Sequence, residues 1–321
     1  MLESPGRSGR TPAPEGPVVV IGAAGLDLVG RAEEPLRPGT SNPARVRMSN
    51  GGVARNVAEN LASLGMPTIL LTAIGDDERG RQLLDDTRAA GVDVEPSLIV
   101  EGGRTGSYLA LLNDQGSLHL AFDDMRVVQS ITPEYLLERK SLIQGAQAVF
   151  LDANLTPPTL AAAVALASRA GVPVAADPTS VGLAPRLVPH LTELWLISPN
   201  EAEADALTPH PVPHADRHPG IDSARHLVAK GVQVAMVTMA EFGVAYATAD
   251  VSGHVPAVHT EIVDPTGAGD AQTAAVIFAL LNDIPLDESV RLGAVAAALT
   301  LRTRGSVVPS LSLEMLYDQL R

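Results

Sequence analysis

The chain alternates short apolar runs with longer segments in which apolar residues recur at helical spacing. Runs such as Val18–Ile21 and Ala148–Asp152 are typical of buried strands, whereas the spacing in Leu286–Leu301 predicts a helix. After residue 125 strands and helices alternate regularly with short links. This order predicts an α/β fold with a right-handed parallel sheet and helices on both of its faces.

Two segments do not follow this alternation. Residues 31–50 are polar and contain prolines, and residues 105–123 contain two strand-like runs on either side of an Asn-Asp-Gln-Gly turn. We interpret both segments as strands of a small separate sheet that covers a pocket. Residues 1–16 are expected to be a disordered tail, and residues 17–321 are expected to form a single domain.

The amino-acid composition argues against several classes of function. The chain has 321 residues, no cysteine and a formal net charge of −14. The absence of cysteine excludes disulfides, thiol catalysis and cysteine-bound zinc. The negative charge disfavours nucleic acid or an anionic membrane as partner. No apolar run is long enough to span a membrane, and the N-terminus lacks the apolar core of a signal peptide. We therefore expect a cytoplasmic protein that acts on a small molecule.

The motifs argue against three kinds of site, namely a P-loop, a dinucleotide-binding site and a helical histidine metal site. The two lysines, Lys140 and Lys230, lie outside any G-x-x-x-x-G-K-[ST] loop, so a P-loop is excluded. The glycines of GAAGLDLVG, residues 22–30, lack the dinucleotide-binding spacing and disfavour an oxidoreductase. His210, His214 and His218 recur every four residues, but the prolines among them prevent a helical metal face.

The stretch DPTGAGDAQTAAVIFALLND, residues 264–283, carries the strongest chemical signal. Its apolar residues have helical spacing, so Gly267, Ala268 and Gly269 lie at a helix N-terminus whose free N–H groups favour an anion. Asp270 would oppose a bound phosphate unless it acts as a general base beside a transferring phosphoryl group. An ordinary glycine turn, with Asp270 only complementing the helix dipole, is the alternative.

The order and spacing of four motifs resemble those of the PfkB or ribokinase family of sugar and nucleoside kinases over residues 17–321. These motifs are SNGGVARNVAENLASLG (49–65), PNEAE (199–203), VTMAEFG (237–243) and DPTGAGDAQTAAVIFALL (264–281). The resemblance implies a ribokinase-like three-layer α/β/α fold with a mainly parallel central sheet and a small β-sheet lid. It also implies phosphoryl transfer from ATP to an alcohol.

The resemblance assigns roles to individual residues. Asp270 is implied as the general base, with an anion hole formed by Gly267, Ala268 and Gly269. The ATP side is implied to include Asn200, Thr238, Gly243, Thr266, Gly267 and Gly269, with Ala240 at a position where the family usually has glycine. Asn200 and Glu203 are implied to organise Mg²⁺ through water. A monovalent cation such as K⁺ is implied at Asp264, Thr266, Gly305 and Ser310.

The acceptor side is implied to include Asp27, which stands near the end of the first strand region, together with Gly51, Gly52 and Asn56. A finer resemblance, carried by GGVARNVAENLASLG, YLALLNDQGSLHLAFDDM, LDANL and the stretch 281–317, is to pseudouridine kinases. It implies phosphorylation of the 5′-hydroxyl of pseudouridine, with Asn154 a candidate for recognition of the uracil. Relatives often dimerise through the lid, so a homodimer is expected.

Other functions stay open at this point. A kinase of the same family could act on ribose, adenosine, fructose or a sugar acid. A non-catalytic nucleoside sensor on the same fold would need neither Asp270 nor the N-x-x-E pair Asn200 and Glu203, and both are present. Measurement of ATP turnover separates the enzyme from the sensor.

Overall fold

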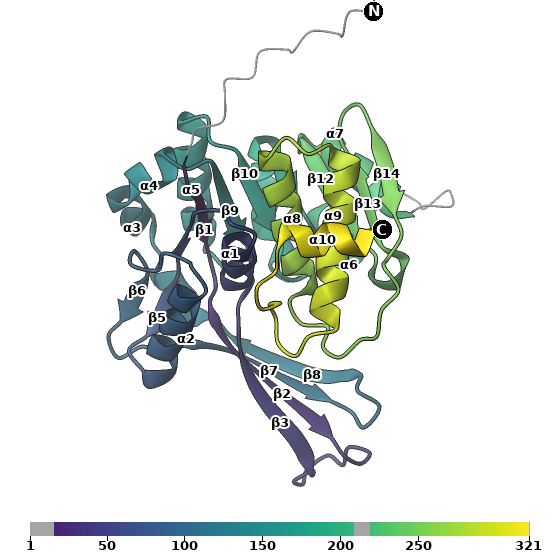
Figure 1. The fold of residues 1–321 in the computed structure, drawn as a ribbon. Coiled ribbons are helices and arrows are strands. Elements are labelled where there is room, and N and C mark those ends of the chain that lie inside the picture. Colours follow the sequence, from purple (N-terminus) through teal and green to yellow (C-terminus); the bar gives the residue numbers. More distant parts are fainter. Residues whose placement is uncertain (1–15, 209–218, 321) are drawn as a thin grey trace, which may run out of the picture.

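The structure, a computed structural model, describes residues 16–208 and 219–320 (Figure 1). The expected N-terminal tail falls almost entirely outside these residues. The histidines at 210, 214 and 218 also lie outside them. Within the described part of the chain, no helix combines the length and apolar character needed to cross a membrane.

An eight-stranded sheet forms the centre of the molecule. Six neighbouring strands are parallel, and the last two are added antiparallel at one edge. This confirms the mainly parallel sheet. In spatial order the strands are β14 (Ser252–Val255), β13 (Val244–Ala247), β12 (Val234–Thr238), β11 (Leu196–Ile197), β10 (Val174–Asp177), β9 (Ala148–Asp152), β1 (Val18–Ile21) and β4 (Thr68–Leu71).

Helices cover both faces of this sheet, because alternate strand residues face opposite sides. In β1, Val18 and Val20 belong to one apolar core, and Val19 and Ile21 belong to the other. The first core is covered by α1 (Val53–Ser63), α2 (Glu78–Ala89), α8 (Ala268–Leu281), α9 (Leu286–Leu301) and α10 (Leu313–Leu320). The second is covered by α3 (Pro133–Glu138), α4 (Lys140–Gln144), α5 (Pro157–Arg169), α6 (Glu201–Leu207), α7 (Pro219–Ala229) and the 3₁₀ helices η1 (Arg126–Ser130) and η2 (Ala184–Glu193). The architecture is a three-layer α/β/α arrangement, as expected.

A second sheet projects from one end of this core (Figure 1). Its four strands lie in the order β3 (Ala44–Gly51), β2 (Gly25–Ala32), β7 (Gly106–Leu112) and β8 (Leu118–Asp124). We call this sheet the lid. The predicted hairpin of residues 105–123 is present as β7 and β8, and β3 comes from the predicted segment 31–50.

Three elements differ from the expectation. Asp27, which was expected near the end of the first strand region, lies inside lid strand β2 (Gly25–Ala32). Gly25 serves close strand packing, because a Cβ there would lie 2.7 Å from the Gly106 carbonyl oxygen. The apolar run 68–74 is divided between β4 and β5 (Ala73–Gly75), which pairs with β6 (Leu98–Val100) in a separate sheet. The sequence predicts one helix near Pro133–Lys140, but the structure has two short helices that meet at Arg139.

Candidate active site

Polar residues gather at the edge of the sheet where the parallel strands end. Asp152 is the last residue of β9, Asp177 the last residue of β10, and the two are register partners. Asn200 follows β11 and bridges to Thr238, the last residue of β12. The carboxyl ends of strands are the usual ligand-binding edge of an open α/β sheet.

The glycine turn approaches this edge at the N-terminus of α8. Gly267 is the N-cap, in the left-handed conformation with φ 78°, and no side chain caps the helix. A Cβ at Gly267 would lie 2.1 Å from the Ser306 carbonyl oxygen, so the turn packs directly on the segment that contains Ser306. A Cβ at Gly269 would meet nothing within 4 Å. The first N–H groups of α8, at Ala268 and Gly269, are therefore free to bind an anion from an open side.

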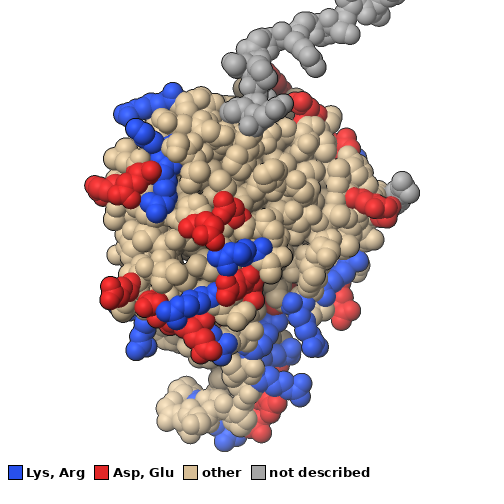
Figure 2. All heavy atoms as spheres, turned by 60° about the vertical axis from the view of Figure 1, so that its left-hand side comes forward, with Lys and Arg blue, Asp and Glu red and all other residues tan. Residues whose placement is uncertain are grey.

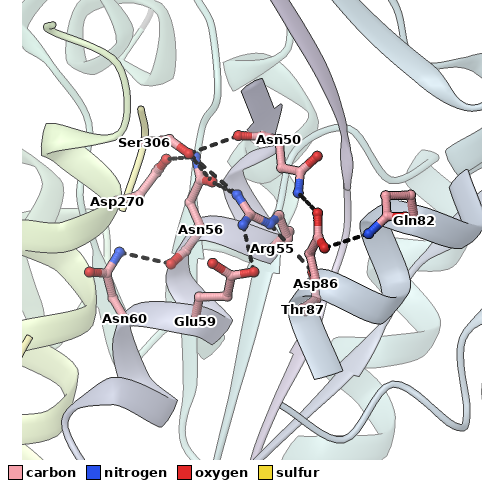
Figure 3. Close-up of polar contacts among 10 residues, drawn as sticks. All are labelled: Asn50, Arg55, Asn56, Glu59, Asn60, Gln82, Asp86, Thr87, Asp270 and Ser306. Carbon is pink, nitrogen blue, oxygen red and sulfur yellow. Dashed lines mark hydrogen bonds and ion pairs between the residues drawn. The ribbon is translucent and has the colours of Figure 1, made fainter. Parts of the chain in front are cut away.

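Asp270 lies in the first turn of α8 and is partly buried. The Asn56 amide Nδ2 donates a hydrogen bond of 2.7 Å to Asp270 Oδ2 (Figure 3). Burial, together with the charges of Asp152 and Asp27, raises the pKa of Asp270 to about 7, although the Asn56 hydrogen bond and the Arg55 charge lower it. A carboxyl group with this pKa can accept a proton near neutral pH.

A second carboxylate, that of Asp152, holds the start of α1 in place. The Asp152 side chain is fully buried and accepts hydrogen bonds from the backbone N–H groups of Ala23, Ala54 and Asn154 at 2.7, 3.2 and 3.0 Å. Burial raises its pKa. Sequence reasoning missed this residue, although an acid at the end of a predicted buried strand was a visible signal. Asp152 thus fixes the segment that carries Gly52 and Asn56.

Asp27 faces the same region from the lid. Its side chain is only 6% exposed, and burial raises its pKa to about 6. The carboxylate lies over the backbone of Gly51, because a Cβ there would come within 2.3 Å of Asp27 Oδ2. Gly52 has φ 96°, and a Cβ there would lie 2.5 Å from the Ala23 carbonyl oxygen. These contacts explain why two consecutive glycines precede α1.

Asn154 lies at the mouth of a different hollow. This hollow has a volume of about 290 Å³ and is also lined by Asp124, Arg126 and Arg186. The Arg186 guanidinium donates to the Asn154 carbonyl oxygen at 3.2 Å, which ties this loop to η2. The loop therefore places Asn154 between the end of β9 and the end of lid strand β8.

Asn200 and Glu203 form a capping box at the start of α6. Asn200 Oδ1 accepts from the Glu203 N–H and Glu203 Oε2 accepts from the Asn200 N–H, both at 2.9 Å. Glu203 is buried and is therefore not a solvated acid on the surface of the helix. Burial raises its pKa. Asp177 is another residue that the sequence prediction missed. Burial first, and then the charges of Asp270 and Glu203, raise its pKa well above the usual range.

These acids place negative charge at the strand ends, which a cation would stabilise. Within residues 16–208 and 219–320, however, no group of three or more His, Asp or Glu side chains is arranged to hold a metal ion directly.

Three of the four residues expected to hold a monovalent cation, Asp264, Thr266 and Gly305, are hydrogen-bonded together. Asp264 is 1% exposed and accepts from the Thr266 N–H at 3.0 Å and the Gly305 N–H at 3.2 Å. Arg47 Nη1, from lid strand β3, lies 2.6 Å from Asp264 Oδ2. Burial would raise the Asp264 pKa, but the hydrogen bonds from Thr266, Gly305 and Arg47 together lower it. Ser310 has φ 60° and lines a separate hollow with Gly305.

The loop after β12 has an unusual backbone. It contains η3 (Ala240–Phe242), and Ala240 has φ 46°, a conformation that favours glycine. Gly243 has φ 97°, and a Cβ there would lie 2.1 Å from the Val255 carbonyl oxygen. Gly243 is therefore required by the backbone of this loop.

The fold and this edge of acids, amides and free N–H groups are those of a phosphoryl-transfer kinase of the ribokinase type. The model of the pfkB family of carbohydrate kinases matches residues 17–312, and the chain belongs to that family.

Individual relatives agree with this assignment. The pseudouridine kinase of Escherichia coli K12 is 34% identical over 299 residues, which cover 92% of this chain and 94% of that protein. The guanosine-inosine kinase of Exiguobacterium acetylicum is 27% identical, with 92% and 97% covered. The structure of Arabidopsis thaliana ribokinase complexed with ribose and ATP superposes with a TM-score of 0.82 at 24% identity, covering 96% and 99%. This last likeness concerns the fold.

Proposed function

We propose that this protein transfers the γ-phosphoryl group of ATP to the 5′-hydroxyl of pseudouridine, giving ADP and pseudouridine 5′-phosphate. The observation that carries the proposal is the position of Asp270, a partly buried carboxyl group with a pKa of about 7 beside the free N–H groups of α8. The choice of pseudouridine is supported by the 34% identity to the Escherichia coli enzyme.

The chemistry follows from these groups. Asp270 accepts the proton of the attacking hydroxyl as the oxygen bonds to the γ-phosphorus and the bond to the leaving ADP oxygen breaks. The N–H groups of Ala268 and Gly269 stabilise the negative charge on the transferring group. Asp27 and Asn56 hold the ribose hydroxyls, for which a carboxylate and an amide are suitable partners. Asn154 and the hollow beside it are the proposed contacts of the uracil.

ATP would lie along the strand ends toward Asn200, Thr238 and Gly243. Asp177 and Glu203 are the acids that could hold Mg²⁺ through its waters, and the ion would offset phosphate charge when bound. Burial raises the pKa of both acids, and the charge of Glu203 also raises the pKa of Asp177, so this pair of acids fits a cation.

A monovalent cation fits this chain less well. Both Asp264 oxygens already accept hydrogen bonds, and the guanidinium of Arg47 supplies a positive charge at the carboxylate. We therefore infer that turnover does not require K⁺. In the Arg47→Ala variant the carboxylate loses its counter-charge, and K⁺ should then raise both turnover and melting temperature. A strict K⁺ requirement of the wild type would contradict this inference.

We also propose a cytoplasmic homodimer that forms through the lid. One face of the lid carries two cross-strand rows of side chains, namely Met48, Leu28, Leu109 and Phe122 in one row and Val46, Gly30, Leu111 and Leu120 in the other. Val46 is 70% exposed and Phe122 is 58% exposed. A continuous apolar face of this kind is typical of a protein interface.

The acceptor is tested by measuring ADP release with a panel of compounds at equal concentration. Pseudouridine should give the highest kcat/KM, and uridine, which differs only in the bond between ribose and uracil, is the matched comparison. Inosine, guanosine, adenosine, ribose, fructose and a sugar acid test the other acceptors of the family. A higher kcat/KM with any of these than with pseudouridine would reject the proposed acceptor. A lack of ADP release with all of them, beside tight nucleoside binding, would favour a sensor.

A further inference from the structure

We propose that Arg55 and Ser306 act as positioning residues that fix the orientation of the Asn56 amide, so that its NH₂ group always faces the Asp270 carboxylate. The proposal rests on the proposed function, because it assigns Asp270 the role of base. Neither Arg55 nor Ser306 approaches the acceptor in this role, since both act through Asn56.

The hydrogen bonds of Asn56 have a definite polarity. Its Nδ2 donates to Asp270 Oδ2 at 2.7 Å. Its Oδ1 accepts from Ser306 Oγ at 2.8 Å and from Arg55 Nη1 at 3.1 Å (Figure 3). The amide therefore has donors on its oxygen side and a carboxylate on its nitrogen side.

A flipped amide would be unfavourable at both ends. Its oxygen would face the Asp270 carboxylate, which is an acceptor when ionised, and its NH₂ would face the donors of the Arg55 guanidinium. Asn56 is 3% exposed, so water cannot compensate the lost hydrogen bonds. Arg55 is the decisive partner, because a guanidinium only donates, whereas the Ser306 hydroxyl could rotate and accept.

Arg55 is itself held firmly. Its side chain is buried, and Nη2 lies 2.5 Å from Glu59 Oε1 one turn further along α1. Nε donates to Thr87 Oγ1 at 3.4 Å, and Nη1 also donates to Ser306 Oγ at 3.3 Å. A planar fork can serve three such partners at once, which a lysine ammonium cannot do in the same geometry. The fork thus connects α1, α2 and the segment of Ser306.

The segment of Ser306 joins this network to the glycine turn. Ser306 Oγ lies 3.0 Å from the Asn50 carbonyl oxygen at the end of lid strand β3, and the Ser306 carbonyl packs on Gly267. The lid, α1 and the turn that carries Asp270 therefore meet at Asn56. Their contacts hold the base and the amide in one arrangement.

The contacts of Asn56 and Arg55 should affect the pH dependence of the reaction. The Asn56 hydrogen bond and the Arg55 charge both lower the pKa of Asp270, against burial and the charges of Asp152 and Asp27. Weakening either should leave Asp270 protonated at a higher pH. The low-pH limb of the kcat/KM profile should report this, because the free enzyme must hold Asp270 ionised to act as base.

The test measures kcat/KM from pH 5.5 to 9 for the wild type, Arg55→Met and Ser306→Ala. The low-pH limb should move upward by about one pH unit in Arg55→Met and by a smaller amount in Ser306→Ala. Arg88→Met is the matched control, because Arg88 is an exposed arginine of α2 that pairs only with Asp85 and Glu95 among the described contacts. Its limb should coincide with that of the wild type.

Arg55→Met leaves Glu59 buried without its partner and could unfold, so circular dichroism and melting are measured first. If it does unfold, Ser306→Ala decides the matter by the direction of its shift. Folded variants with lower kcat and an unmoved limb would overturn the proposal, since that pattern indicates a packing role alone. Failure of the proposed function looks different, because the wild type would then show no low-pH limb or Asp270→Asn would keep full turnover.

Discussion

The proposed acceptor site depends on Gly51 having no side chain. The Asp27 carboxylate occupies the space that a Cβ at Gly51 would need, at 2.3 Å from Oδ2. A Gly51→Ala variant must therefore displace Asp27 or the end of β3. Because displacement of a binding group by about 1 Å can cost about 10²-fold in rate, we expect kcat/KM for the acceptor to fall by about 10- to 100-fold. The KM for ATP should change little.

Gly30→Ala is the matched control for this prediction. Gly30 lies in lid strand β2, and a Cβ there would make ordinary contacts, the closest at 3.7 Å to Leu111 Cδ2. Its kinetics should equal those of the wild type. Equal losses in both variants would mean that the lid, and not the Asp27 contact, explains the effect.

The loop between β12 and β13 stores strain at Ala240. Its φ of 46° costs an ordinary residue about 1 kcal/mol, and glycine avoids this cost. We expect Ala240→Gly to raise the free energy of unfolding by up to about 1 kcal/mol in urea titrations. Ala161→Gly, at an exposed position in α5, should lower it by about the same amount. A loss of stability in Ala240→Gly would contradict the strain argument.

Most elements could be predicted from the sequence, because their patterns are local. Ala148–Asp152 and Leu286–Leu301 have the predicted bounds, since buried strands and apolar helices have clear periodicities. Strand β2 could not be predicted in the same way. Its glycines do not mark it as a strand, and Gly25 is explained by the close approach of Gly106 in β7, a distant part of the chain.

Some of the candidate site residues could be predicted from the sequence, and others could not. Asp270, Asn56 and Asp27 were found through motifs, and the structure places the first two in direct contact across 214 residues of sequence. Arg47 could not have been predicted, because its pairing with Asp264 depends on how the lid folds back over the glycine turn. Asp152 and Asp177 were predictable from their strand ends but were missed.

At the scale of the whole molecule, the surface carries charges of both signs, whereas one face of the lid is apolar. Figure 2 shows arginines and acids interspersed on one side of the molecule, without a large area of one sign. The lid face around Phe122 contrasts with this surface. A mixed charge pattern supports solubility, whereas the lid face would be costly to leave in water.

If the lid forms the dimer, a charge on its exposed apolar face should break it. We expect Phe122→Glu to sediment as a monomer at a concentration where the wild type is a dimer. Phe242→Glu is the matched control, because Phe242 is 66% exposed but lies in η3, outside the lid. It should remain a dimer, and a dimeric Phe122→Glu would disprove the lid interface.

The proton transfer at Asp270 is the central claim, and Asp270→Asn tests it most directly. Steady-state ADP release with pseudouridine is compared between this variant and the wild type at pH 8, with nucleoside binding measured by calorimetry. We predict a loss in kcat of about 10²-fold or more with nucleoside affinity retained, because asparagine keeps the shape of the side chain but cannot accept the proton. A kcat equal to that of the wild type would contradict the account.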